Sequence, residues 1–191
     1  MSYTQQNYLL RNNAAAEYNS FVMPVTRNID DVDVRILALL QENARIAQTE
    51  IARAVGLAPS AVLERIRKLE ARGAIKGYVA LVDPHVIDQR QLAFVAVRTS
   101  VVGEEERAVA ARLAAIPEVM EVHYVAGDDC LLLKVRARDA EHIGQLLQNQ
   151  VSAVPGVRST RTTIVLGSVK ECPRLALPPV EEESERGERA S

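Results

Sequence analysis

The sequence predicts an α+β protein with an N-terminal winged helix-turn-helix followed by a ferredoxin-like βαββαβ domain. Residues 30–74 carry apolar side chains at the period of an α-helix, and Gly56 interrupts this pattern where two helices need a tight turn. Residues 92–166 instead alternate between strand-like and helical segments. A chain of 191 residues has room for both of these small domains.

The first predicted helix runs from Asp30 to about Gln41. Asp30 is a good N-cap residue, because its carboxylate can accept hydrogen bonds from the first N–H groups of the helix. Four apolar residues recur at the helical period and form one stripe, namely Val32, Ile36, Leu37 and Leu40. These features predict an amphipathic helix that packs on its neighbours.

Two further predicted helices are separated by Gly56. Thr49 is the predicted N-cap of the first of them, and Gly56 supplies the left-handed residue that ends it. Pro59 suits the first turn of the other, which runs to about Arg72. Its buried side is predicted to carry Val62, Ile66 and Leu69. The glycine turn between two short helices predicts a helix-turn-helix, and residues 74–83 suit a strand or wing that follows it.

The second half predicts a four-stranded antiparallel sheet. The strands are expected at residues 92–102, 119–126, 131–136 and 157–166, and the helices at 104–115 and 140–151. The order β-α-β-β-α-β is that of a ferredoxin-like sandwich with both helices on one face of the sheet. The other face carries apolar residues that need a partner, so we expect a dimer formed through this half.

Five segments follow from these patterns. They are a flexible N-terminal extension (1–27), the winged helix-turn-helix (28–76), a linker strand and hinge (77–90), the ferredoxin-like domain (91–172) and an acidic disordered tail (173–191).

Composition narrows the function classes. With 48% hydrophobic and 25% charged residues and no long apolar run, a membrane span is not expected. Cys130 and Cys172 are too few and too far apart for a zinc site, so neither a metal nor another cofactor is expected. The sequence contains neither a phosphate-binding glycine loop nor a nucleophile motif, so an enzyme is not expected. The net charge of −2 hides a basic segment, because residues 58–76 carry five Lys or Arg residues against two glutamates.

The exposed face of the third predicted helix suits the major groove of DNA. Arg and Lys side chains can reach guanine edges or phosphates, and hydroxyl groups at helix N-termini can hold phosphates. The candidate DNA-binding residues are Thr49, Ser60, Ala61, Glu64, Arg65, Lys68 and Arg72. An ordinary solvated helix face, with an intrahelical pair between Glu64 and Lys68, is the alternative. The preceding Gly56 turn favours the DNA interpretation.

The sequence resembles the Lrp/AsnC family, the leucine-responsive and asparagine-type "feast/famine" transcription regulators of bacteria and archaea. The resemblance covers about residues 28–172. It rests on IDDVDVRILALLQENAR (29–45), TEIARAVGLAPSAVLERIRKLEARGAIKGYVALVDP (49–84), VAGDDCLLLKV (125–135) and PGVRSTRTTIVL (155–166). It implies a regulator that binds double-stranded DNA. It also implies a C-terminal effector-sensing domain that forms dimers, which join into octamers or other even assemblies. The low cysteine count makes a reducing cytoplasm the expected location, where a DNA-binding regulator would be associated with the nucleoid.

In this family the effector, usually an amino acid, binds near the glycine-aspartate loop and the last strand. Carried over to this sequence, the effector-binding residues are Tyr124, Gly127, Asp128, Cys130, Ala140, Thr160, Thr162, Thr163, Ile164 and Val165. Glycine N–H groups can bind a carboxylate, and an aspartate can pair with an α-ammonium group. The loop departs from the family pattern Gly-Asp-aromatic-Asp, because Asp129 and Cys130 follow Asp128. The identity of the effector therefore stays open, and a simple hairpin turn is the alternative.

Two other functions share this two-domain plan. Siroheme decarboxylases are enzymes that hold a tetrapyrrole on a similar scaffold, but the basic helix face and the absence of a histidine cluster argue against that function here. A DNA-organising protein that needs no effector is the second alternative, and the altered loop is compatible with it.

Overall fold

The computed structural model describes residues 29–180, which form two compact units. One unit comprises residues 29–80 together with 171–180, and the other comprises residues 81–170. The predicted N-terminal extension and residues 181–191 of the predicted tail lie outside the described residues. No helix between residues 29 and 180 is long and apolar enough to cross a membrane.

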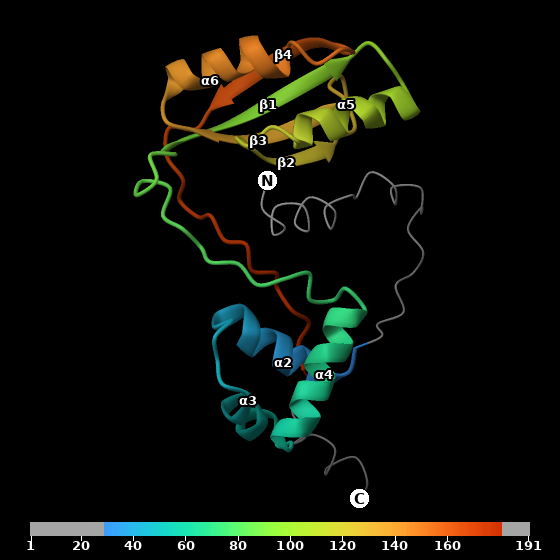
Figure 1. The fold of residues 1–191 in the computed structure, drawn as a ribbon, viewed down its shortest axis with the longest axis vertical. Coiled ribbons are helices and arrows are strands. Elements are labelled where there is room, and N and C mark those ends of the chain that lie inside the picture. The colour runs from blue at the N-terminus through green and yellow to red at the C-terminus, as the bar shows by residue number, and fades with distance from the viewer. Residues whose placement is uncertain (1–28, 181–191) are drawn as a thin grey trace, which may run out of the picture. The chain divides into compact units, whose positions relative to one another are not determined.

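The first unit is built from three helices (Figure 1), which are α2 (Asp31–Glu42), α3 (Gln48–Val55) and α4 (Pro59–Ala71). Asp30 caps α2 as predicted, and it does so reciprocally with Asp33. The Asp30 carboxylate accepts from the N–H of Asp33 at 2.8 Å, and the Asp33 carboxylate accepts from the N–H of Asp30 at 3.4 Å. Gly56 ends α3 with φ +70°, and Pro59 opens α4, so both turn predictions are confirmed.

The core of this unit joins all three helices. It contains Ile36, Ile51, Ala52, Val62, Ile66 and Leu69, each no more than 8% exposed. The predicted buried side of α4 is therefore confirmed, and the opposite side of this helix faces solvent. One predicted cap is wrong: Thr49 lies inside α3, whose N-cap is Ala47. The N–H groups of Glu50 and Ile51 bond to the Ala47 carbonyl, so the helix begins before the threonine.

The wing expected over residues 74–83 does not form a strand. A strand requires a neighbouring strand for its backbone hydrogen bonds, and the described part of the chain gives this segment none. The Tyr78 hydroxyl instead donates to Glu70 on α4 at 3.0 Å. Val79, Leu81 and Val82 are between 58 and 75% exposed, so this segment carries apolar side chains without covering.

Part of the C-terminal segment belongs to the helical unit. The Gln41 side chain on α2 donates to the carbonyl of Leu175 at 3.1 Å and accepts from its N–H at 2.7 Å. This paired contact joins residues 134 positions apart. The chain therefore returns to the helical unit after completing the sheet.

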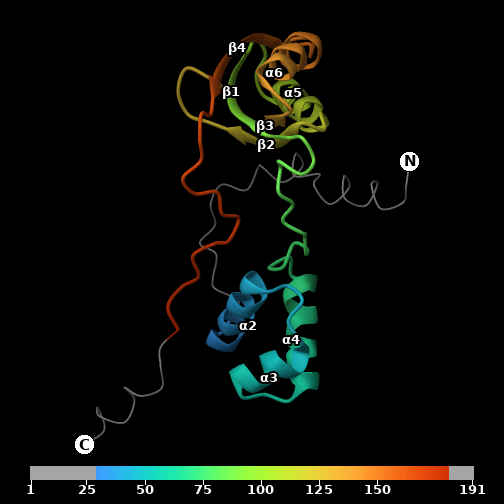
Figure 2. The ribbon, with the colours of Figure 1, turned by 90° about the vertical axis from the view of Figure 1, so that its left-hand side faces the viewer.

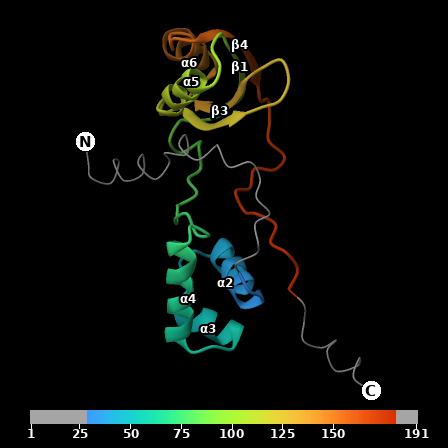
Figure 3. The same cartoon turned by 90° about the vertical axis from the view of Figure 1, so that its right-hand side faces the viewer.

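The second unit is the predicted antiparallel sheet with two helices. Its elements are β1 (Gln91–Thr99), α5 (Glu104–Ala114), β2 (Val119–Tyr124), β3 (Leu131–Ala137), α6 (Ala140–Leu146), the π-helical turn η2 (Leu147–Val151) and β4 (Val157–Ile164). The strand order is β2-β3-β1-β4, as a ferredoxin-like sandwich requires. Figures 2 and 3 show α5 and α6 on the same face of the sheet. The predicted α+β class and element order are confirmed.

Strand alternation separates the two faces of this sheet. Val95, Val97, Leu131 and Leu133 face the helices and are fully buried, together with Leu113 of α5. Phe94, which alternates with Val95 on β1, is instead 36% exposed. Met120 on β2 is 52% exposed, and Ile164, which pairs with Ala93 at the end of β4, is 36% exposed. The sheet thus buries one face within the protomer and leaves apolar groups at its surface.

Candidate nucleic-acid interface and ligand pocket

The exposed side of α4 lies beside the beginning of α2 and forms a groove of about 570 Å³ with it. The groove is lined by Ile29, Asp30, Asp33, Ala61, Glu64, Arg65, Lys68, Leu69 and Arg72. This surface therefore contains five of the predicted DNA-binding residues. Ala61, Glu64, Arg65 and Lys68 lie on α4, and Arg72 is its C-cap residue. Ser60 is exposed in the first turn of α4, and Thr49 is exposed on α3.

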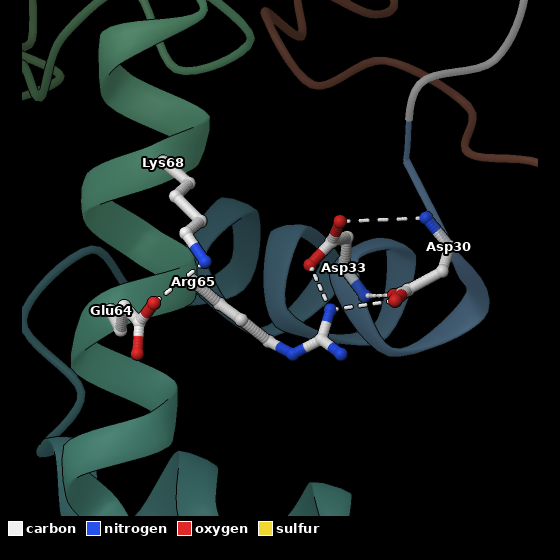
Figure 4. Close-up of polar contacts among 5 residues, drawn as sticks. All are labelled: Asp30, Asp33, Glu64, Arg65 and Lys68. Atoms are coloured by element: carbon white, nitrogen blue, oxygen red, sulfur yellow. Dashed lines mark hydrogen bonds and ion pairs between the residues drawn. The ribbon is translucent and has the colours of Figure 1, made fainter.

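Arg65 is engaged with the two acids that cap α2 (Figure 4). Its Nη1 atom lies 2.7 Å from Oδ2 of Asp30 and 2.8 Å from Oδ1 of Asp33. The Asp33 side chain is only 10% exposed, so this carboxylate depends on Arg65 and the capping contact for its polar partners. Arg65 therefore joins the exposed side of α4 to the N-terminus of α2, a contact that the sequence did not predict.

The charges of this cluster stabilise one another. The hydrogen bonds to Asp30 and Asp33 raise the pKa of Arg65. Burial alone would raise the pKa of Asp30, but the hydrogen bond from the Asp33 N–H and the Arg65 guanidinium outweigh it, and the pKa lies below its ordinary value of 3.8. The ionised form of Asp30 is therefore the form that the fold favours.

A pH dependence follows from the lowered pKa of Asp30. Asp30→Asn keeps an N-cap oxygen but removes the charge, so wild type should unfold less readily than this variant near neutral pH. The difference should be constant above about pH 5 and should shrink as the pH falls below 3.8, because the Asp30 carboxyl of the unfolded chain then takes up a proton before that of the folded protein, whose pKa is lower. Chemical denaturation from pH 7 to pH 3 measures this difference. Asp31→Asn is the matched control, and a difference that does not change with pH would contradict the prediction.

Lys68 is held more weakly than Arg65. Its Nζ atom lies 2.6 Å from Oε1 of Glu64, one helical turn away, and the two side chains are 60% and 67% exposed. The hydrogen bond from Lys68 lowers the pKa of Glu64. Solvent screens such exposed pairs strongly, so a phosphate can replace the glutamate. The intrahelical pair between Glu64 and Lys68 that the sequence predicted as the alternative is present. Because this pair is exposed, Lys68 can still exchange Glu64 for another anion.

Arg67 is a cation that sequence analysis left out of the interface. It is exposed on α4 next to Lys68. The sequence could have indicated this residue, because it lies between the candidate DNA-binding residues Arg65 and Lys68 in the same basic segment. Arg67 and Lys68 are thus exposed cations of α4, while Arg65 is partly buried against α2.

The glycine-aspartate loop forms a second hollow, of about 300 Å³, on the sheet unit. The N–H of Cys130 donates to the Val97 carbonyl at 3.0 Å, and Thr160 pairs with Val97 from the other side. The loop and the beginning of β4 therefore meet at one end of β1. Of the predicted effector residues, Asp128 and Thr160 line the hollow.

The remaining predicted effector residues are distributed along the sheet. Ile164 pairs with Ala93, four residues along β1 from Val97, a separation of about 13 Å at the rise of a strand. The N–H of Val165 bonds to the Leu92 carbonyl, so Val165 also lies at that far end. Thr162 and Thr163 lie between the ends, and Ala140 begins α6 close after Ala137, which pairs with Gln91. One protomer does not gather the whole predicted set.

Three charged residues at the hollow were not predicted, namely Arg98, Asp129 and Arg161. Arg161 contacts Asp129 at 2.6 Å, and Arg98 donates to the carbonyl of Asp128 at 2.9 Å. These residues could not be predicted because the sequence does not show the register of β1 and β4, which brings Arg98 and Arg161 together. Asp129 stands one position before the place of the second acid in the family pattern Gly-Asp-aromatic-Asp.

Comparison with known families assigns each unit. Residues 29–70 match the AsnC-type helix-turn-helix domain, and residues 92–175 match the Lrp/AsnC ligand binding domain. The leucine-responsive regulatory protein of Salmonella typhimurium is 38% identical over 155 residues, which cover 79% of this chain and 93% of the relative.

Solved structures show the same relationship. A transcriptional regulator from Neisseria meningitidis in complex with L-Met superposes with a TM-score of 0.72 at 28% identity, over 78% of this chain and 96% of that one. The feast or famine regulatory protein from M. tuberculosis, complexed with L-methionine, gives 0.71 at 34% identity, over 78% and 99%. Relatives named as regulators support the predicted regulatory function rather than an enzyme. The chain belongs to the Lrp/AsnC family of DNA-binding transcriptional regulators.

Proposed function

We propose that the protein binds double-stranded DNA as a dimer or larger assembly, through α4, and that an amino acid bound to the sheet unit adjusts this binding. The observation that carries the proposal is the surface of α4. Its inner side is buried against α2 and α3, and its outer side presents Lys68, Arg67 and the N-terminal Ser60 behind the Gly56 turn. An exposed basic helix held in this way can enter the major groove.

Among the predicted DNA-binding residues, the contacts suggest a division of roles. Lys68 and Arg72 are suited to phosphates, and Ser60 and Ala61 lie in the first turns of α4, where side chains approach base edges. Thr49 lies on the preceding helix α3, where its hydroxyl group can reach the sugar-phosphate backbone of the same DNA site. Glu64 is then the internal partner that Lys68 exchanges for a phosphate.

Self-association is supported by the apolar groups that the protomer leaves exposed. Phe94, Met120 and Ile164 lie on the sheet unit, and Val79 and Leu81 lie on the connecting segment. A second copy of the chain would cover such groups, and a two-fold dimer presents two recognition helices to DNA. Octamers formed from these dimers are the assembly that the family resemblance implies. Binding to the chromosome would place the protein in the cytoplasm, on the nucleoid.

An amino acid effector is supported by the two relatives solved with methionine. The hollow beside the loop offers the groups that such a ligand needs, because guanidinium groups bind carboxylates and carboxylates bind ammonium groups. A DNA-organising protein that responds to no effector remains the second candidate, because Asp129 already occupies Arg161.

DNA footprinting with salt-dependent binding tests the DNA part of the proposal. Two protected half-sites about 10 base pairs apart, or a multiple of this spacing, are expected for a dimer. Lys68→Ala should weaken binding and reduce the slope of log K against log salt concentration by about one per protomer, because one phosphate contact is lost. Arg53→Ala, on the exposed side of α3, serves as the matched control. An unchanged slope, or protection of a single unpaired half-site, would refute this assignment.

A further inference from the structure

The hollow beside the loop carries an ion cluster that no prediction included. Arg98 lies on β1, Arg161 lies on β4, and Asp129 belongs to the loop between β2 and β3. The strand register pairs Arg98 with Ser159 and Arg161 with Ala96, so both arginines are on the sheet face opposite the helices. The hydrogen bond from Cys130 to Val97 brings the loop to the same place.

One carboxylate serves two guanidinium groups in this cluster. Nη2 of Arg161 lies 2.6 Å from Oδ2 of Asp129, and Nη2 of Arg98 lies 4.0 Å from Oδ1 of the same group. The Asp129 side chain is 20% exposed, whereas Arg161 is 78% exposed and Arg98 is 44% exposed. A guanidinium group has five N–H donors and pairs best with a carboxylate in a two-point contact. Both arginines therefore have N–H groups that can bind the carboxylate of a ligand from solvent.

The hollow also contains groups for the rest of a small zwitterion. Asp128 lines it and can pair with an ammonium group, and Ser159, which pairs with Arg98 on the same sheet face, provides a hydroxyl group. The volume of about 300 Å³ lies at the lower end of the range for small-molecule sites. The ligand class that matches these groups is a small molecule with a free carboxylate and an amino group.

We propose that Asp129 is an internal competitor, which holds Arg161 in the absence of ligand and is displaced when the carboxylate of an amino acid binds there. This inference rests on the proposed function, because it describes how the effector is bound. Displacement costs affinity, since only the fraction of molecules with Arg161 released can bind. The loop acid thus sets the concentration at which the protein responds.

Calorimetric titration of the full chain with the twenty amino acids tests this competition. Asp129→Asn should bind its amino acid about fivefold more tightly than wild type, the factor that one surface ion pair is worth. Arg161→Gln should bind at least tenfold more weakly, which is the cost of losing a charged partner. L-methioninol, which lacks the carboxylate of L-methionine, should not bind. Glu105→Gln, an exposed acid on α5, is the control and should match wild type.

The outcomes separate this inference from the proposed function. If wild type binds an amino acid and Asp129→Asn binds it equally or more weakly, the competition is refuted while amino acid regulation stands. If only Asp129→Asn binds, the competition is supported and amino acid regulation of the wild type fails. If neither protein binds any of the twenty, both are refuted. Thermal unfolding of each variant shows whether it is folded, and Arg161 is exposed enough for its replacement to be tolerated.

Discussion

Replacing Arg65 by alanine is expected to lower the free energy of unfolding of the helical unit by about 2 kcal/mol. The reason is that Asp33, whose side chain is 10% exposed, loses its charged partner, and Asp30 loses its second contact at the same time. DNA binding should weaken as well, because α4 is no longer held against the N-terminus of α2. Amide hydrogen exchange in α2 and α4 measures the first effect for this unit separately from the sheet unit.

The salt dependence of DNA binding distinguishes this role from a direct DNA contact. If Arg65 positions α4, Arg65→Ala should weaken binding without changing the salt slope, in contrast to Lys68→Ala. Arg67→Ala removes the same side chain from an exposed position of the same helix, and its effect on stability should be small. Arg65→Lys should recover only part of the stability, because an ammonium group lacks the planar fork that reaches both acids. A lower slope with unchanged stability would show that Arg65 contacts phosphate instead.

Replacing Gly156 by alanine should cost about 3 kcal/mol of unfolding free energy in the sheet unit. Gly156 has φ +98°, which side chains rarely adopt, and an added Cβ would lie 2.8 Å from Cγ2 of Val109 and 3.1 Å from Cγ2 of Val101. Val109 is 2% exposed in the core and cannot move aside freely. The Gly156 carbonyl also accepts from the Ser100 N–H at 2.9 Å, a bond that a shifted turn would break.

Chemical denaturation followed by hydrogen exchange in β1 and β4 measures this loss. Gly167→Ala is the control, because its Cβ would meet nothing within 4 Å and its φ is not in the left-handed region. Combining Gly156→Ala with Val109→Ala should cost less than the sum of the two single changes, since the smaller side chain relieves the close contact. Equal stability of the two glycine variants would mean that the turn adapts without strain.

Much of the fold could be predicted because its signals are local. Asp30, Gly56 and Pro59 mark helix ends through backbone groups within a few residues, and the structure confirms all three. The alternation of strands and helices also predicted the order of the sheet unit. Thr49 was misplaced by the same kind of reasoning, because α3 begins at Gln48 without a side-chain cap.

The predicted wing shows where local patterns are insufficient. The apolar residues of 74–83 suit a strand, but a strand exists only when another strand pairs with it. The described part of the protomer supplies none, and Tyr78 bonds to α4 instead. Burial and the Glu70 hydrogen bond raise the pKa of Tyr78 to about 12, so this contact persists across the physiological range.

The candidate sites divide in the same way. The basic helix, the glycine turn and the aspartate loop were recognisable because their residues are close together in the sequence. The roles of Arg65 and Arg161 were not, because their partners Asp33 and Asp129 are each 32 residues away. Side chains this far apart meet only after helices have packed and strands have paired in register, and hydrophobic periodicity carries no record of which charges will then face each other. Local chemistry therefore established a helix-turn-helix joined to a four-stranded sheet, and tertiary packing decided which charges hold the fold and which can bind a partner.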